Sequence, residues 1–377
     1  MAESTTFTGN ISSTRTTYQT LTSKDAFETS VQWACFNKTP FTKAVGVEAF
    51  GVAAMKDLQA FGVAQPTGRI IEMKSGVYGV RGPIFSTSGS ATHVGRMGSF
   101  NPELVEGGDE YAYSWHRLIA STYIPDVDVQ DNGKGLIDIK LQKQAGMKQE
   151  FVQAFNYALL GNSNGPNDGV LGPSAVYSDL PNLISVTQSR SVGGITKAAS
   201  GAWGNGTKEV LSIGGGGEMD RPLVLRRSMQ DAMNDQAKHA EASKDYLLLA
   251  TQGAYQYYDR LGYADNIQSG RGIGVLEKYD ALGIDHFAFS KQPLIWDAAV
   301  TLPYGATAST EAIYGIHIPS YKVNIRSEEN FIFDGWEAPR VHDQYRTLNA
   351  QIRLRYTPMV TAMRPHFVLY NLPACGD

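Results

Sequence analysis

The clearest pattern of hydrophobic and polar positions along the chain lies in the segment 135–160, GLIDIKLQKQAGMKQEFVQAFNYALL. Its apolar residues recur mostly every three or four positions, as in an amphipathic helix. We therefore expect one helix, roughly 40 Å long at about 1.5 Å per residue. Asp131 and Asn132 are its N-cap candidates, and Gly161-Asn162 is its expected C-terminal stop. The expected apolar face consists of Ile137, Leu141, Ala145, Met147, Phe151, Val152, Ala154, Phe155, Ala158 and Leu159.

Alternation with a period of two predicts strands on both sides of this helix. The segment 111–124 carries large residues at 111, 113, 115, 119 and 123, which predicts one half-buried strand. The segments 321–326, 350–363 and 365–372 have the same character, and 331–347 is expected to be a polar turn region. We expect a long antiparallel hairpin in this C-terminal part of the chain.

A basic face accompanies the last predicted strands. Ile352, Leu354 and Tyr356 alternate with Arg353 and Arg355, which places the apolar residues inward and the arginines outward. The arginine face is either an ordinary solvated sheet surface or a contact between subunits, and the pattern leaves both interpretations open.

The middle of the chain alternates helix-like and strand-like segments. Residues 25–62 predict one or two short helices, and 220–236 predicts a helix with Pro222 in its first turn. The apolar run 245–251 predicts a buried strand, 253–263 a following helix, and 286–296 further strands. This alternation indicates a mixed α/β domain.

Two segments contain too few apolar residues to fold alone. Thr and Ser make up 12 of the first 24 residues, so this terminus is either disordered or an arm ordered by a neighbour. The segment 68–102 contains 7 glycines and short apolar pieces, which predicts a two-stranded ribbon without its own core. The ribbon therefore needs support from another surface.

Composition narrows the functional classes. The 377 residues are 42% hydrophobic and 19% charged, with a formal charge of −4, which disfavours specific nucleic-acid recognition and binding to an anionic membrane. No apolar run approaches the length of a membrane span or resembles a signal peptide, so the chain is expected to fold in a reducing cytoplasm. Cys35 and Cys375 are then two reduced thiols.

Candidate catalytic and cofactor motifs are weak. The string 161–165, GNSNG, matches the GxSxG pattern of a hydrolase, but it follows a helix where the nucleophile elbow needs a strand. The glycine runs 214–217 and 270–274 lack the lysine and hydroxyl of a phosphate loop. No pair among the seven histidines has the spacing of metal ligands. We therefore expect no enzyme activity, catalytic residue, cofactor or metal. The histidines are His93, His116, His239, His286, His317, His342 and His366.

The order of these segments resembles the major capsid proteins of tailed double-stranded DNA phages, which share the Hong Kong 97-type fold. The most specific pieces are LPNLI at 180–184, VGGI at 192–195, Trp203 and the closing segment 352–372. The resemblance spans most of the chain and implies an α+β fold. That fold has an N-terminal arm, an E-loop hairpin, a P-domain with a long spine helix and a mixed α/β A-domain.

The resemblance also implies domain boundaries. The N-terminal arm would be 1–45 and the E-loop 63–117. The P-domain would comprise 46–62, 118–190 and 318–364, with the spine helix at about 134–160, and the A-domain would comprise 191–317 and 365–377. The E-loop would overlap an adjacent subunit. Too little sequence precedes the arm for a built-in scaffolding region, so a separate scaffolding protein is expected unless the chain is already processed.

The implied function is a major capsid protein that self-assembles into hexamers and pentamers of an icosahedral head enclosing double-stranded DNA. Its partners would be itself, the portal, a scaffolding protein, a possible decoration protein and non-specifically held DNA, with no membrane. It would be located in the virion and assembled in the host cytoplasm. The alternatives are the shell protein of a bacterial encapsulin-like nanocompartment and a hydrolase that uses the GNSNG loop. Candidate contacts between subunits are Arg81, Arg96, Trp115 and Arg346.

Overall fold

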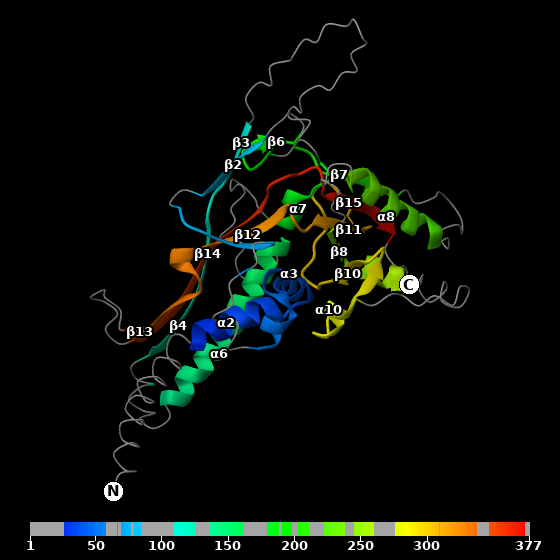
Figure 1. Cartoon of the computed structure of the whole chain (residues 1–377). Helices are drawn as coiled ribbons and strands as arrows, with labels where there is room; N and C mark the ends of the chain where they lie inside the picture. Colours follow the sequence, from blue (N-terminus) through cyan, green and yellow to red (C-terminus); the bar gives the residue numbers. More distant parts are fainter. Residues whose placement is uncertain are drawn as a thin grey trace, which may run out of the picture.

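The architecture is that of a computed structural model, drawn in Figure 1. The structure describes residues 26–57, 66, 69–76, 79–84, 109–125, 128, 136–161, 179–187, 191–197, 203–210, 222–237, 245–259, 276–308, 310–337 and 347–373. Two larger sheets dominate these residues, and α6 (Leu136–Leu160) runs beside the first of them.

The first sheet has five strands and is built around the long strand β14 (Thr347–Val360). One edge of β14 pairs antiparallel over its whole first part, from Thr347↔Pro125 to Tyr356↔His116. Its other edge pairs antiparallel with two shorter strands, β12 and β13. The strand β1 pairs in parallel with the outer edge of β12. The other strands are β1 (Ile71–Lys74), β4 (His116–Pro125), β12 (Tyr321–Arg326) and β13 (Ile332–Glu337).

Helices cover one face of the five-stranded sheet. Ile352, Leu354 and Tyr356 are buried on this face, and Phe155 of α6 meets Tyr356 edge to face at 5.3 Å between ring centroids. The helix α2 (Ala26–Asn37) packs against α6, and α3 (Pro40–Lys56) packs against α2. A continuous apolar core joins these helices to the sheet.

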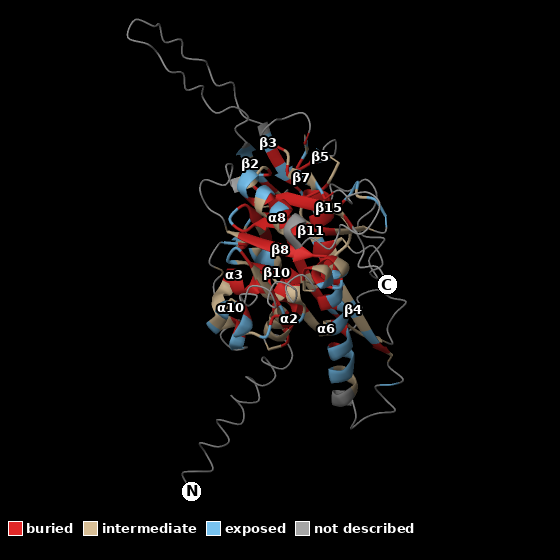
Figure 2. Cartoon of the chain, turned by 90° about the vertical axis from the view of Figure 1, so that its right-hand side faces the viewer, coloured by how far each residue is buried: buried red, intermediate tan, exposed pale blue. Residues whose placement is uncertain are grey.

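The second sheet has six strands in the order β7-β15-β11-β8-β10-β9. Its central strand β8 (Tyr246–Ala250) is buried at every position, because both faces of the sheet are covered. The helix α8 (Pro222–Ala237) lies against one edge and buries Leu225 and Met229 (Figure 2). The other strands are β7 (Gly206–Glu209), β9 (Phe287–Phe289), β10 (Gln292–Trp296), β11 (Thr310–His317) and β15 (Phe367–Pro373).

Smaller elements connect the two sheets and the ribbon. A helix at 252–259 follows β8, and the remaining strands form two separate pairs. They are β2 (Val80–Ile84) with β3 (Asp109–Tyr113), and β5 (Ser191–Val192) with β6 (Ile195–Thr196); the short helices are α7 (Leu180–Leu183), α10 (Glu277–Asp280) and a 3-10 turn at Ser327–Glu329.

Most predicted elements are confirmed. The α+β class, the single long helix, the two helices within 25–62 and the buried strand at 245–251 are all present. Gly161 ends α6 with φ +73° and donates to the carbonyl of Tyr157, as a left-handed C-terminal stop does. The N-cap candidates Asp131 and Asn132, the stop's Asn162 and residues 1–25 of the predicted N-terminal arm lie outside the described residues. Residues 26–45 of that predicted arm are described, and they form α2 and the start of α3 within the core. Antiparallel pairing in the C-terminal part is confirmed between β12 and β14.

Two strand predictions are wrong. The segment 111–124 forms two strands, β3 and β4, because the chain breaks at Ser114 and Trp115 and each strand joins a different partner. The segment predicted as a polar turn contains β13, which pairs with β14 across an irregularity between Phe333 and Trp336. Gly335 has φ +82° there, and this backbone shift lets a mixed polar and apolar sequence remain paired.

The predicted apolar face of α6 is mostly buried from Met147 onward. Phe151, Phe155 and Leu159 are fully buried, whereas Leu141 is 53% exposed and Ala145 is exposed. Within the described residues, the first turns of α6 therefore extend past the body of the chain (Figures 1 and 2).

Candidate functional site

Among the described residues, the ribbon formed by β2 and β3 is tied to the body at its base. The ring of Tyr111 stacks on buried Trp203 at 5.8 Å and 13°, and the Trp203 indole N–H donates to the carbonyl of Val192 at 3.0 Å. The backbone N–H of Ala112 donates to the carbonyl of Gly193 at 2.8 Å. Apolar stacking and hydrogen bonds thus fix the ribbon's direction where it leaves the body.

Glycine allows the close approach at this base. Gly79 has φ +136°, and a Cβ there would lie 2.2 Å from the carbonyl oxygen of Tyr113. Any other residue would push the two strands apart, so the ribbon begins where a glycine is needed. Beyond this point β2 and β3 pair only with each other among the described strands, and Arg81 and Glu110 are exposed.

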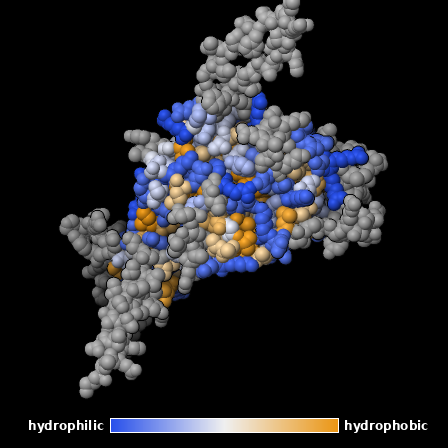
Figure 3. Space-filling model, in the orientation of Figure 1, coloured by the Kyte–Doolittle hydropathy of each residue, from blue (hydrophilic) through white to orange (hydrophobic). Residues whose placement is uncertain are grey.

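The ends of α6, β4 and β13 lie at the opposite end of the molecule from the ribbon (Figures 1 and 2). Two of these elements, α6 and β4, carry large exposed apolar side chains. We call this region the distal end and define it by Ile119, Tyr123 and Leu141. These side chains are 45%, 61% and 53% exposed. In the view of Figure 3, hydrophobic residues reach the surface near this end.

The pleat of β4 explains the exposure of Ile119 and Tyr123. Leu118 and Ile124 are buried, and side chains alternate between faces, so Ile119 and Tyr123 point away from α6. Arg353 and Asn349 are their partners in β14. The sequence placed 119 and 123 on the same face as 111 and 113, and this part of the prediction is wrong because the break before β4 shifts the alternation by one residue.

The arginines of the same outer face are paired within the chain. Arg355 Nε lies 2.8 Å from Glu329 Oε2, and Arg117 Nε lies 3.7 Å from the same oxygen. Arg353 pairs with Asp334. The outward position predicted for Arg353 and Arg355 is confirmed. Because both arginines form ion pairs within the chain, the interpretation as an ordinary sheet surface is favoured over a contact between subunits.

The structure places the predicted contact residues at different points. Arg81 is exposed on β2, opposite Ala112. Trp115 is half-buried at the ribbon base, and its indole N–H donates to the carbonyl of Gly76 at 3.1 Å. Arg96 and Arg346 lie outside the described residues. The contact roles of all four stay predictions, and the exposed apolar residues of the distal end were missed.

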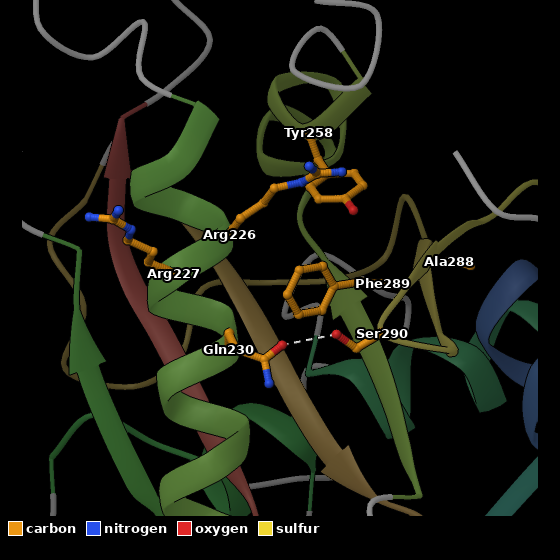
Figure 4. A pocket seen from close by; sticks show the side chains of 7 residues that line it. All are labelled: Arg226, Arg227, Gln230, Tyr258, Ala288, Phe289 and Ser290. Carbon is orange, nitrogen blue, oxygen red and sulfur yellow. Dashed lines mark hydrogen bonds between the residues drawn. The ribbon is translucent and has the colours of Figure 1, made fainter. Parts of the chain in front are cut away.

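An open pocket of about 370 Å³ lies between α8 and the β9–β10 turn (Figure 4). Arg226 extends toward Tyr258, and Phe289 forms the floor between them (Figure 4). Two lining groups bind each other, since Ser290 Oγ donates to Gln230 Oε1 at 2.9 Å. The Gln230 amide N–H donates in turn to Asn234. These bonds stabilise the pocket walls, and we assign the pocket no ligand.

Two buried carboxylates connect distant elements: Asp297 binds helices to the end of β10, and Glu48 binds α3 to α10 and Arg69. Asp297 follows β10 and accepts hydrogen bonds from the backbone of Phe41 at 3.2 Å and from Asn156 of α6 at 3.1 Å. Glu48 of α3 accepts from Tyr279 Oη at 2.6 Å and pairs with Arg69 and Lys278. Both carboxylates are satisfied by partners from distant elements, which is typical of structural groups.

The described residues offer little for catalysis. No group of three or more His, Cys, Asp or Glu side chains among them is arranged to hold a metal ion. Cys35 is a free thiol buried against Phe36, and burial raises its pKa, so it is a poor nucleophile. The GNSNG loop after Gly161, both glycine runs and Cys375 lie outside the described residues. In the part of the chain that is described, every helix falls short of a membrane span.

Comparisons with known proteins give matches in structure alone. No protein-family model matches the chain. No curated protein matches it. Among solved structures, the chain is similar to a chain of the cyanophage A-1(L) capsid, with 9% identity, a TM-score of 0.49, and coverage of 81% of this chain and 90% of that one.

Other similar structures come from related particles. A chain of the capsid of the Myoviridae phage XM1 is 9% identical with a TM-score of 0.49, over 81% of this chain and 90% of that one. A chain from the capsid of an empty GTA particle is 11% identical with a TM-score of 0.46, over 81% and 88%. The chain is thus similar in arrangement to phage capsid chains over about four fifths of its length.

Proposed function

We propose that this chain is the major capsid protein of a tailed phage and assembles into the hexamers and pentamers of an icosahedral head around double-stranded DNA. The observation that carries the proposal is the distal end, where Ile119, Tyr123 and Leu141 lie 45–61% exposed on elements that run out from the core. The sequence resemblance points to the same class.

The exposed side chains favour self-association. Tyr123 and Ile119 share one outer face, and Leu141 lies on the helix that packs behind it. Large apolar side chains grouped on an exposed element mark contacts with a partner. Tyrosine is also enriched at the centres of interfaces. In a closed shell of one polypeptide, a second copy supplies that partner at every symmetry axis.

The ribbon supplies the second proposed contact. A two-stranded ribbon is marginal in water by itself, and β2 and β3 have no other strand partner in the described part of the chain. Its base is fixed to the body by the stacking of Tyr111 on Trp203. We propose that it overlaps an adjacent subunit, and that Arg81, Arg96, Trp115 and Arg346 contribute to contacts between subunits.

We also propose the domain division that the sequence resemblance implies. The P-domain (46–62, 118–190 and 318–364) would contain α6 and most of the five-stranded sheet, and the A-domain (191–317 and 365–377) would contain the six-stranded sheet. The E-loop (63–117) would contain β2–β3, and the arm would be residues 1–45. The chain passes between the two sheets at 318–320 and again at 361–366, close to the proposed boundaries. A portal, a separate scaffolding protein and a decoration protein are further proposed partners in the virion, and shells would form in the host cytoplasm.

The proposal is tested by purifying the chain and a ribbon variant and imaging both by electron microscopy. Ile84 and Asp109 are paired directly across the ribbon, so Asn-Gly can replace residues 85–108 as a two-residue turn. The parent chain should form closed shells, and the variant should stay folded as free subunits or capsomers. Normal shells from the variant would contradict the ribbon's role.

The contents of the particles separate the phage head from a nanocompartment. Shells isolated from the native source should protect double-stranded DNA from nuclease. Shells that contain protein cargo and no DNA would favour the nanocompartment alternative.

A further inference from the structure

Two buried histidines lie where the chain passes between the two sheets. His317 is the last residue of β11, and His366 immediately precedes β15. The two connections also bind each other, since the N–H of Thr361 donates to the carbonyl of Ser320 at 2.9 Å. This junction is the only place among the described residues where β strands of the two sheets follow each other within a few residues along the chain.

The two imidazoles are linked through the backbone. The N–H of His317 donates to Nδ1 of His366 at 3.1 Å, and Nδ1 of His317 lies 2.5 Å from Ser320 Oγ. His366 is fully buried, and its Nε2 has no hydrogen-bond partner. Because Nδ1 of His366 accepts a hydrogen bond, that nitrogen carries no proton, and the ring is neutral in this arrangement.

The surroundings of His366 oppose a positive charge. Lys197 lies nearby with 3% exposure, and its ammonium donates to Ser185 Oγ and Asn205 Oδ1, both neutral, at 2.8 Å each. The ring of Tyr246 is 5.5 Å from His317, and half-buried Arg364 stands two residues before His366. Burial, then His317 and Lys197, hold the pKa of His366 well below its usual range.

We propose that His366 is an acid-sensitive latch that holds the end of β11 to the start of β15, two neighbouring strands of the six-stranded sheet, at the junction between the sheets. While the ring is neutral, Nδ1 holds the backbone of His317 and keeps β11 aligned with the connection into β15. A proton taken up at Nδ1 breaks this bond and places a cation beside Lys197. The end of β11 then separates from the start of β15, and the junction opens locally. The latch belongs to one chain and does not depend on the proposed function.

The sign of the pH dependence follows from linkage. A histidine whose pKa is lowered in the closed state binds its proton mainly after opening, so the latch is fully closed above the ordinary pKa of about 6.5. As the pH falls below that value, the opening equilibrium should shift toward the open state about tenfold per pH unit, because one proton is taken up.

The first test measures the titration of each histidine in the intact, unmodified protein. Deuterium exchange at the imidazole carbon between the two nitrogens, read by mass spectrometry, reports each pKa whatever the particle size. For His366 we expect slow exchange and no inflection between pH 5.5 and 8. An inflection near pH 6.5 at His366 would overturn the latch.

The second test follows opening through backbone amide exchange, corrected for the intrinsic effect of pH. In the parent, protection of peptides covering 313–318 and 366–370 should fall about tenfold per unit between pH 6.5 and 5. His366→Gln keeps an oxygen acceptor but cannot titrate, so its protection should not change over this range. His116→Gln removes a half-buried histidine from the five-stranded sheet and should respond like the parent.

Either of two results would refute the latch. One is a parent whose protection at these peptides is independent of pH. The other is a His366→Gln protein that opens with acid as the parent does. If His366→Gln does not fold, the titration of the unmodified protein still decides the question.

Discussion

Replacing Tyr123 by alanine should weaken assembly without unfolding the subunit. Tyr123 is 61% exposed, the highest exposure among the large hydrophobic side chains of the described residues. A buried aromatic side chain covers about 150–250 Å², so sealing the exposed fraction of Tyr123 would remove roughly 90–150 Å² from water. At about 25 cal/mol per Å², this contributes about 2–4 kcal/mol to each contact.

That free energy sets the size of the expected effect. A loss of about 2–4 kcal/mol per contact corresponds to roughly a 30- to 700-fold higher subunit concentration for assembly, at about 1.4 kcal/mol per factor of ten. The fold should be nearly unaffected, because exposed substitutions usually change stability by within about 0.5 kcal/mol. Sedimentation velocity over a range of concentrations measures the first quantity, and thermal unfolding of the dissociated subunit measures the second.

Tyr123→Phe is the matched control, because it keeps the apolar ring and removes only the hydroxyl. It should assemble at close to the parental concentration. The reasoning is refuted if Tyr123→Ala assembles as readily as Tyr123→Phe, since Tyr123 then faces solvent in the assembled state as well.

Three further substitutions test the contacts inside the chain. Trp203→Ala removes the buried support of Tyr111 and should cost about 3–5 kcal/mol in the free energy of unfolding, measured in urea; a loss below about 1 kcal/mol would show that the ribbon base is held otherwise. Glu48→Gln removes the charge shared by two cations and should cost about 1–2 kcal/mol by the same measurement, whereas a stabilised protein would contradict this. Gly79→Ala should cost more than about 1 kcal/mol and expose the ribbon base to proteolysis, because its Cβ meets the Tyr113 carbonyl; parental cleavage rates would argue against this strain.

Elements with one strong period could be predicted from the sequence. The buried half of α6 repeats apolar residues at helical spacing, and β8 is an unbroken apolar run, so local pattern and tertiary burial agree. The alternation at Ile352, Leu354 and Tyr356 likewise placed the buried face of β14 correctly.

The sequence was misleading where neighbours decide the structure. Ser114 and Trp115 look like ordinary strand residues, yet the chain changes partner there from β2 to β14. The alternation therefore restarts, and Ile119 and Tyr123 turn outward. Similarly, Asp334 and Gly335 resemble a turn, but β14 supplies an edge along which β13 pairs around them.

The candidate site was hard to predict for the same reason. Leu141 lies on the same helical face as Phe151 and Phe155, which are buried farther along α6. The sequence pattern alone does not show that the core ends before it reaches Leu141. The junction of His317 and His366 brings together residues 49 positions apart, and no pattern in the sequence indicated that they lie side by side.

The mass of the purified protein in solution tests the central claim most directly. One chain has a mass of 41.0 kDa. Light scattering coupled to size separation at micromolar concentration should find capsomers or complete shells, because the distal end and the ribbon become buried only against other copies. A stable species of 41.0 kDa under these conditions would contradict the account.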